Sequence, residues 1–229
     1  LDTMLPVNAL QRSTVKGLSG MGARFALKRL FDVIMSVLVV VVGAPVFMVV
    51  AVLVKLSSPG PVFFVQDRAG KDGNTFRMYK FRTMAGKPND SLLVWTESEE
   101  ARITKIGRFL RDYGLDELPQ VLNILRGDMS IVGPRPPLPM QAEQYTDRQQ
   151  IMFSMRPGVI SFADVKGRRS IAMEERIEWH VWYVQNWSMR LDIEILWKTL
   201  FIVLRRQNAF ETDVREETPD GAARQVSKT

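Results

Sequence analysis

The chain has 229 residues, no cysteine and a single histidine, His180, and its formal net charge is +6 from 31 basic and 25 acidic residues. The lack of cysteine excludes disulfides, thiolate zinc sites and cysteine nucleophiles. Catalysis must therefore rest on carboxylate, lysine, arginine, tyrosine or hydroxyl groups, and we expect His180 to be a packed or surface residue of an aromatic helix and not a general base. The positive charge suits lipid headgroups and phosphate compounds. We expect no nucleic-acid partner, because basic residues alternate with acidic ones instead of forming an aromatic-studded patch.

The N-terminal part combines a polar arm with a long apolar segment. Residues 1–27 predict a basic, flexible arm. Residues 33–54 are 22 uncharged residues, interrupted by Gly43, Ala44 and Pro45. A continuous helix of this length would just cross a bilayer core of about 30 Å, but proline kinks or splits a helix. Because both flanks are basic, neither end is favoured for export. The segment predicts either a single span or a re-entrant helix that enters and leaves by one face.

The chain then changes from helical to strand-like periodicity. Residues 57–61 form a breaker cluster of Ser, Pro and Gly. Residues 62–66 and 75–81 are rich in β-branched and aromatic residues and flank the turn sequence 70–74, which predicts a β-hairpin. On the second strand, Lys80 and Arg82 are expected to share one face.

Two helices are predicted next, with a carboxylate pair between them. Residues 103–113 have a basic face and an apolar face, and Gly114 ends that helix. Asp116 is expected to cap the following helix, which Gly127 ends. Its apolar residues repeat at i, i+3, i+4 and i+7 and predict a buried face made of Leu118, Val121, Leu122 and Leu125. Residues 131–137 read as a rigid loop that holds Arg135 between prolines.

The last third predicts an amphipathic helix over residues 192–206, followed by a disordered tail at 207–229. The apolar stripe of the helix consists of Ile193, Leu196, Trp197, Leu200, Phe201 and Leu204. Such a stripe can pack on the core or lie in a membrane interface with tryptophan at headgroup level. Both readings stay open from the pattern alone.

Asp116 and Glu117 stand at a predicted helix start, where the simpler interpretation is capping. Four basic residues beside turns or breakers can converge on the same helix end, which favours anions: Lys80, Arg82, Arg111 and Arg135. Carboxylates repel phosphate, so a phosphate site with its own acids needs a divalent cation and several basic groups. Oxygen-only ligation indicates Mg²⁺, with Mn²⁺ as a further option.

Eight blocks in order carry a family resemblance: residues 28–32 (KRLFD), 58–63 (SPGPVF), 79–84 (YKFRTM), 115–120 (LDELPQ), Asn123, 126–130 (RGDMS), 132–136 (VGPRP) and 156–158 (RPG). In this respect the chain resembles the monotopic phosphoglycosyl transferases, the bacterial sugar transferase family, over about residues 28–206. Ordered blocks on this scale are far more specific than one short motif.

The resemblance implies transfer of a sugar 1-phosphate from a nucleoside diphosphate sugar, usually a UDP-sugar, to polyprenol (undecaprenyl) phosphate, with release of UMP. By match to the family's Asp-Glu pair, Asp116 would be the nucleophile that forms a covalent phosphosugar intermediate and would lie beside Mg²⁺. Glu117 would handle protons or position the acceptor phosphate. Lys80, Arg111 and Arg135 match positions linked to phosphate binding.

The implied fold is α+β and mostly helical, with a small β-hairpin and amphipathic interfacial helices around a cytoplasmic active site. Residues 28–57 would form a re-entrant membrane helix with its break at residues 43–45, and residues 58–206 the catalytic domain. The expected location is the bacterial inner membrane, with the catalytic domain on its cytoplasmic face. Membrane lipids are expected partners, and a homodimer is possible. We further expect the small form of the family, which consists of the catalytic domain alone.

The chain departs from the family at two places. Many members have Ser-Pro at the membrane break, where this chain has Ala44 and Pro45. After residues 156–158, many members continue Thr-Gly-Trp-Ala-Gln-Val-Asn-Gly-Arg, whereas this chain has ISFADVKGR at 160–168. The usual donor preference is therefore not carried over. The alternative to an enzyme is a non-catalytic membrane scaffold, which would keep its function when Asp116 is replaced with asparagine.

Overall fold

The computed structural model describes residues 21–86, 101–167 and 171–204. The described part is mostly helical, as predicted, and has two small sheets, of which only the β-hairpin was predicted. Its elements are α2 (Met21–Ser57), β1 (Phe63–Ala69), η2 (Lys71–Gly73), β2 (Thr75–Phe81), α4 (Lys105–Tyr113), η3 (Leu115–Gln120), α5 (Val121–Arg126), β3 (Ser130–Val132), α6 (Pro139–Ala142), η4 (Gln149–Ser154), β4 (Gly158–Ile160), α7 (Phe162–Lys166), α8 (Met173–Gln185) and α9 (Met189–Leu204).

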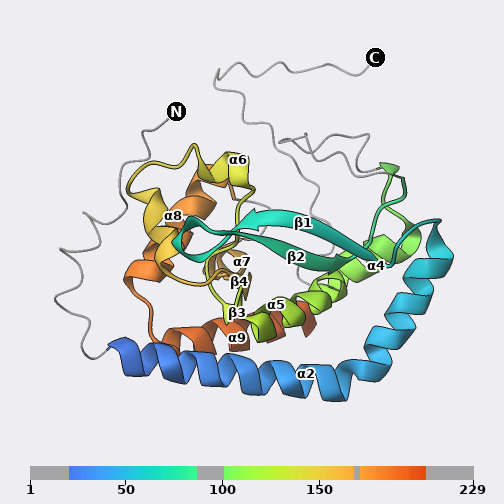
Figure 1. The fold of residues 1–229 in the computed structure, drawn as a ribbon, viewed down its shortest axis with the longest axis horizontal. Helices are drawn as coiled ribbons and strands as arrows, with labels where there is room; N and C mark the ends of the chain where they lie inside the picture. The colour runs from blue at the N-terminus through green and yellow to red at the C-terminus, as the bar shows by residue number, and fades with distance from the viewer. Residues whose placement is uncertain (1–20, 87–100, 168–170, 205–229) are drawn as a thin grey trace, which may run out of the picture.

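Helix α2 is one continuous element of 37 residues with Pro45 inside it. It bends along its course and does not unwind (Figure 1). The predicted break at Gly43, Ala44 and Pro45 is therefore a bend in an unbroken helix, as expected when a proline removes one hydrogen bond but the rest of the ladder survives. The helix begins at Met21, so residues 21–27 of the predicted arm are helical. The rest of that arm lies outside the described residues, as does the predicted tail.

Both ends of α2 are attached to the rest of the fold. Near the start, Lys28 donates to Asp192 on α9 at 2.6 Å, and Arg29 donates to the carbonyl of Ile124 at 2.6 Å. Near the end, Val50 and Val54 are buried in a cluster that includes residues of β2 and α4. The helix is thus anchored twice to one globular body.

Between these anchors, α2 exposes its apolar surface. The large apolar residues exposed on the helix are Leu27, Leu30, Ile34, Val37, Leu38, Val39, Val41, Val42, Val46, Met48, Val49, Val52, Leu53 and Leu56. The segment from Gly22 to Ser57 is long and apolar enough to cross a membrane, and 11% of its most apolar window is buried. A contiguous apolar surface of this size on a soluble protein marks an interaction site.

The predicted hairpin is confirmed. Strands β1 and β2 pair antiparallel, with Phe64 opposite Lys80 and Arg68 opposite Phe76. Asn123 of α5 holds β2 in place, because its side chain accepts from the amide of Tyr79 at 3.1 Å and donates to the carbonyl of Arg77 at 2.7 Å.

The helix before the carboxylate pair is confirmed, and it starts at Lys105, capped by the Thr104 side chain. Gly114 ends it in the left-handed conformation (φ 68°), which glycine adopts without steric cost. The next turn, η3, is a 3₁₀ segment whose cap is Gly114, so the prediction that Asp116 caps it is wrong. The predicted apolar face is also partly wrong, because Leu122 is 41% exposed. The buried residues of α5 are Val121, Asn123 and Ile124.

Two short strands missed by the sequence analysis form a second sheet. Strand β3 pairs parallel with β4, with Ser130 opposite Gly158 and Val132 opposite Ile160. The segment after β3 and the segment before β4 are in close backbone contact at Gly133, where an added Cβ would lie 2.5 Å from the carbonyl oxygen of Arg156. This close backbone contact fixes where the loop carrying Arg135 leaves β3.

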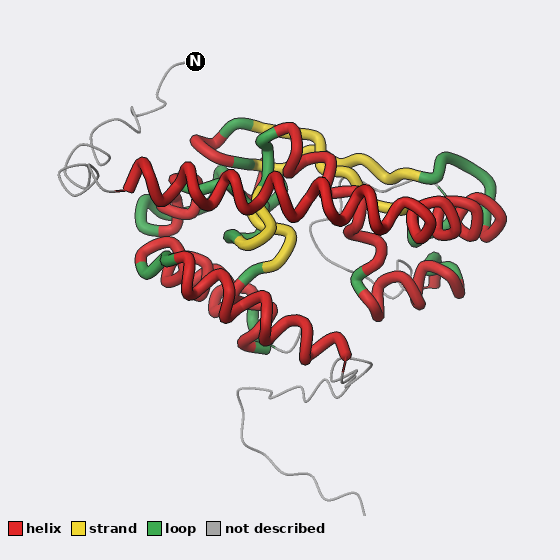
Figure 2. Tube along the Cα trace, turned by 90° about the horizontal axis from the view of Figure 1, so that it is seen from below, coloured by secondary structure: helices red, strands yellow, loops and turns green. Residues whose placement is uncertain are grey.

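Helices α8 and α9 complete the body. His180 is buried in α8, and Tyr183 and Ile195 belong to a cluster with Val132. The outer stripe of α9 remains exposed at Ile193, Trp197, Leu200 and Phe201. Both α2 and α9 lie along the lower side in Figure 1, and both are in view from below in Figure 2. Leu196 of the predicted stripe packs against the core cluster that includes Val132, so the stripe has a core-facing part and an exposed part.

Candidate active site

Asp116 is a buried carboxylate in the first turn of η3. It is 9% exposed, and among the described residues its side chain accepts no hydrogen bond. Burial raises the pKa of Asp116, while the positive charges of Lys80, Arg111 and Arg135 oppose that rise. Because the Asp116 carboxylate lies near cations but accepts no hydrogen bond from them, its oxygens are available to a ligand or an electrophile.

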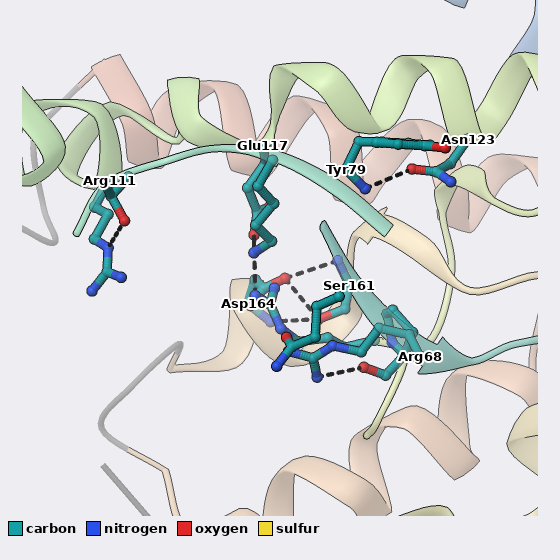
Figure 3. Close-up of polar contacts among 12 residues, drawn as sticks. Arg68, Tyr79, Arg111, Glu117, Asn123, Ser161 and Asp164 are labelled. Carbon is teal, nitrogen blue, oxygen red and sulfur yellow. Dashed lines mark hydrogen bonds and ion pairs between the residues drawn. The ribbon is translucent and has the colours of Figure 1, made fainter. Parts of the chain in front are cut away.

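Glu117 is the centre of an ion-paired cluster. Its Oε1 accepts from Lys80 Nζ at 2.6 Å and from Arg135 Nη2 at 3.1 Å. Burial disfavours the ionised form, but the two cations outweigh this and lower the pKa of Glu117 to about 2. In Figure 3, Glu117 points toward the side on which Arg68, Ser161 and Asp164 lie. Glu117 is therefore a permanent anion at neutral pH and the counter-ion of both cations.

Lys80 reaches the site from β2, where its neighbours along the chain face the other side of the hairpin. Its side chain is 15% exposed. Burial lowers the pKa of Lys80, and the carboxylate of Glu117 counteracts this. The lysine charge is thus held in a partly desolvated setting, where it interacts strongly with any further anion.

Arg135 reaches the same carboxylate from the loop after β3. The backbone around it is fixed by hydrogen bonds from Gly133 to the carbonyl of Ile160 at 3.0 Å and from Gly158 to the carbonyl of Pro134 at 2.9 Å. The Arg135 side chain is 39% exposed. Glu117 raises the pKa of Arg135. One face of this guanidinium therefore holds Glu117 while part of the group remains open to a ligand.

Unlike Lys80 and Arg135, neither Arg111 nor Arg82 donates to Glu117 within the described part of the chain. Arg111 donates to the hydroxyl of Thr83 at 2.9 Å, and its charge acts on Asp116. Arg82 instead donates to the carbonyls of Val54, Ser58 and Pro59, at 3.1, 2.6 and 2.9 Å. It closes the C-terminal end of α2, as basic side chains commonly do. The structure therefore brings three of the four predicted cations, Lys80, Arg111 and Arg135, to the acids, and gives Arg82 a structural role.

The acids also fit the predicted metal. The described residues contain no group of three or more His, Cys, Asp or Glu side chains that could enclose an ion. Mg²⁺ is usually held by one or two carboxylates together with substrate phosphates and water. Asp116, whose carboxylate has no partner among the described side chains, and the adjacent Glu117 supply such a set.

The sequence analysis placed Asn123 and Lys28 in the family blocks but predicted no role for either in positioning the site. Asn123 is fully buried and joins α5 to β2 and to Asp128. Lys28 joins α2 to Asp192 and to the carbonyl of Val132 at 2.9 Å. The role of Lys28 has no local signal, because its partners are more than 100 residues away in the sequence.

The site thus joins the two acids Asp116 and Glu117 to the cations Lys80, Arg111 and Arg135, and the same body carries a long exposed apolar helix. The comparison with known families is in accord. The model of the family described as "Bacterial sugar transferase" matches residues 23–206, and the chain belongs to this family.

Several relatives are similar over most of this chain. UDP-glucose:undecaprenyl-phosphate glucose-1-phosphate transferase of Klebsiella pneumoniae is 39% identical over 188 residues, covering 79% of this chain and 40% of that protein. The uncharacterized sugar transferase EpsL of Bacillus subtilis is 40% identical over 189 residues, 82% of this chain and 92% of that protein. The exopolysaccharide production protein ExoY of Sinorhizobium fredii is 37% identical, over 76% of this chain and 83% of its own length. The chain thus spans about two fifths of the length of the glucose-1-phosphate transferase and nearly all of EpsL.

Proposed function

We propose that this protein transfers a sugar 1-phosphate from a UDP-sugar to undecaprenyl phosphate and releases UMP. The observation that carries the proposal is Asp116, a buried carboxylate without a side-chain partner among the described residues, next to a Glu117 that already neutralises Lys80 and Arg135. The names of several relatives state a UDP-sugar donor and undecaprenyl phosphate as acceptor. A site with these charges is suited to two successive phosphoryl transfers.

In the first step, an Asp116 carboxylate oxygen attacks the β-phosphorus of the donor. The bond between that phosphorus and the bridging oxygen breaks, UMP leaves with the electron pair, and the sugar phosphate remains on Asp116 as an acyl phosphate. Lys80, Arg111 and Arg135 stabilise the charge that develops on the phosphate oxygens.

In the second step, a phosphate oxygen of undecaprenyl phosphate attacks the phosphorus of this acyl phosphate. The bond from phosphorus to the Asp116 oxygen breaks, which restores the carboxylate and gives undecaprenyl diphosphosugar. Because its pKa is about 2, Glu117 is a weak base at neutral pH. Its role in this proposal is to hold Lys80 and Arg135 where the phosphates bind.

A magnesium ion fits the acids and would be held by Asp116 and Glu117 together with substrate oxygens, with Mn²⁺ as a further option. When bound, the ion would screen the negative charge of the diphosphate. The residues of the chain would then orient the donor, and burial of the acid pair would limit the access of water to the acyl phosphate.

We further propose that α2 is re-entrant in the bacterial inner membrane, with the catalytic body on the cytoplasmic face. Its two ends are attached to one body, through Lys28 at the start and Val54 near the end, and its apolar surface is exposed between them. A helix tied at both ends to one body on one side of the bilayer cannot leave on the opposite side. The exposed stripe of α9 would lie at headgroup level, where the acceptor phosphate is found.

The enzymatic proposal is tested on purified protein with a panel of UDP-sugars, undecaprenyl phosphate and Mg²⁺. The wild type is expected to release UMP and to label the lipid, and Asp116→Asn is expected to do neither. Asp112→Asn serves as the matched control, because Asp112 is an exposed acid on the preceding helix. Full turnover by Asp116→Asn would exclude Asp116 as nucleophile, whereas a wild type that releases no UMP with any UDP-sugar would favour the non-catalytic scaffold.

The topology is tested with single cysteines, which is straightforward because the chain has none of its own. Arg24→Cys and Pro61→Cys place exposed thiols on either side of the apolar segment. A membrane-impermeant thiol reagent should reach both from the cytoplasmic side. Labelling from opposite sides would show that α2 spans the membrane.

A further inference from the structure

A small pocket opens beside Glu117, on the side of the β1–β2 hairpin. It is lined by Arg68, Glu117, Gln120, Arg135 and Gly158, among others, and holds about 200 Å³ of empty space, part of it open to solvent. Two of the side chains that line it are arginines, so the lining suits a small anionic group.

Arg68 enters this pocket from β1, the strand opposite the one that carries Lys80. Its guanidinium donates to the carbonyl of Pro136 at 3.2 Å and to Gln66 Oε1 at 2.7 Å. Its Nε is buried and has no hydrogen-bond partner among the described residues. Arg68 thus presents a cation to the pocket whose contacts in the described chain are all with neutral acceptors.

The surroundings of Arg68 are unfavourable for a purely structural cation. Burial, and then the charge of Arg135, lower the pKa of Arg68 to about 10. Glu117 is the acid that acts on it, but both described hydrogen bonds of Glu117 go to Lys80 and Arg135. A desolvated cation without an ion-pair partner costs folding free energy, so an anionic ligand would supply what the chain does not.

The charges of the site lead to the same point. Lys80, Arg111 and Arg135 carry three positive charges against the two negative charges of Asp116 and Glu117. Arg68 adds a fourth cation next to Arg135, and the cluster stays net positive even when Asp164, which also acts on Arg135, is counted. Arginine is also suited to this ligand, because its planar fork donates two parallel hydrogen bonds to phosphate oxygens.

We propose that Arg68 and Arg135 form a phosphate subsite that holds one phosphate group of the reacting substrates. The subsite rests on the proposed function for the identity of its ligand. Two substrates carry the required chemistry: the diphosphate of the UDP-sugar and the phosphate monoester of undecaprenyl phosphate. Arg68 then contacts substrate, and its hydrogen bond to Pro136 sets its distance from Arg135.

The test compares the wild type with Arg68→Gln and Arg68→Lys, and uses Arg77→Gln as the matched control. Arg77 is an exposed arginine on the other strand of the same hairpin. Binding of inorganic pyrophosphate is measured by calorimetry on the full chain in detergent. Arg68→Gln is expected to bind about 10- to 100-fold more weakly, as for a lost hydrogen bond to a charged group. Arg68→Lys should be intermediate, and Arg77→Gln should stay within twofold of the wild type.

A second measurement separates ligand binding from a structural role. The unfolding midpoint of ligand-free Arg68→Gln should equal or exceed that of the wild type, because a desolvated cation next to Arg135 has been removed. Unchanged pyrophosphate affinity in Arg68→Gln would overturn the proposal. So would a lower midpoint accompanied by equal loss of affinity in the Gln and Lys variants, because that result identifies Arg68 as a structural tie to Pro136.

Kinetics identify the source of the phosphate. A rise in the KM for the UDP-sugar assigns the subsite to the donor, and a rise in the KM for undecaprenyl phosphate assigns it to the acceptor. If neither KM rises, the subsite does not take part in the reaction and the proposal fails. If the wild type releases no UMP with any UDP-sugar but Arg68 still controls pyrophosphate binding, the proposed function fails while the phosphate subsite stands.

Discussion

Replacing Glu117 with glutamine removes the anion that joins Lys80 to Arg135. In the wild type, Oε1 of Glu117 accepts from Lys80 at 2.6 Å and from Arg135 at 3.1 Å. Burial opposes ionisation of this carboxyl, yet the two cations lower its pKa from 4.5 to about 2. At about 1.4 kcal/mol per pH unit, the ionised carboxylate contributes about 3 kcal/mol to the free energy of unfolding.

The stability difference between Glu117→Gln and the wild type should depend on pH. Because the pKa of Glu117 is lower in the folded protein than its ordinary value of 4.5, the contribution is complete above pH 4.5 and is lost as the pH falls toward about 2. At pH 7, Glu117→Gln should be about 3 kcal/mol less stable than the wild type. Near pH 3 the difference should shrink to about 1 kcal/mol, since the wild-type carboxyl is then largely protonated in the unfolded chain and partly so in the folded one.

The assay is thermal unfolding in detergent, followed by tryptophan fluorescence at both pH values. For a chain of this size, about 3 kcal/mol corresponds to a shift in Tm of about 6–12 °C. Glu178→Gln is the control, because Glu178 pairs with Arg148 at 2.6 Å on the surface and should change stability by less than about 1 kcal/mol. The reasoning is refuted if the Tm of Glu117→Gln equals that of the wild type at pH 7, or if the difference is the same at pH 3.

Two further predictions concern the surroundings of the site. Gly133→Ala should destabilise the fold by about 1–3 kcal/mol and reduce turnover. The reason is that its Cβ would lie 2.5 and 2.7 Å from backbone atoms and would displace the loop that carries Arg135. Unchanged UMP release and Tm would contradict this prediction. His180 is buried, and burial lowers its pKa to about 4. Between pH 6.5 and 4 the unfolded chain therefore binds a proton that the folded chain does not, and the free energy of unfolding of the wild type should fall by about 3 kcal/mol over this range. His180→Met should flatten this part of the stability curve in equilibrium unfolding, and a curve identical to the wild type would contradict the assignment.

Local patterns predicted the elements whose contacts are local. The hairpin follows from two strand-like runs around a Gly-rich turn, and its strands are found at Phe63–Ala69 and Thr75–Phe81. The ends of α4 and α5 follow from Gly114 and Gly127, both at positive φ. These features depend on sequence separations of a few residues, which is where periodicity and glycine placement carry information.

The predictions that failed concern contacts between residues that are far apart in the sequence. Arg82 was grouped with Lys80 by strand alternation, but β2 ends at Phe81 and Arg82 reaches back to the end of α2. Strands β3 and β4 have three residues each, too few for a period, and they pair across 28 residues of sequence. Arg68 was not singled out from the sequence, and only the hairpin register places it on the strand that pairs with the one carrying Lys80.

The membrane helix and the phosphate site share one hydrogen-bonded connection. Lys28 of α2 donates to the carbonyl of Val132, three residues before Arg135, and to Asp192 of α9, which also accepts from the hydroxyl of Tyr183 at 2.6 Å. A buried lysine with these partners is costly to displace, because each group left behind would be an unpaired charge or dipole. The position of α2 and the position of Arg135 at Glu117 are therefore set by the same contacts. In the proposed function, this coupling would hold the site at the height of the acceptor phosphate above the membrane.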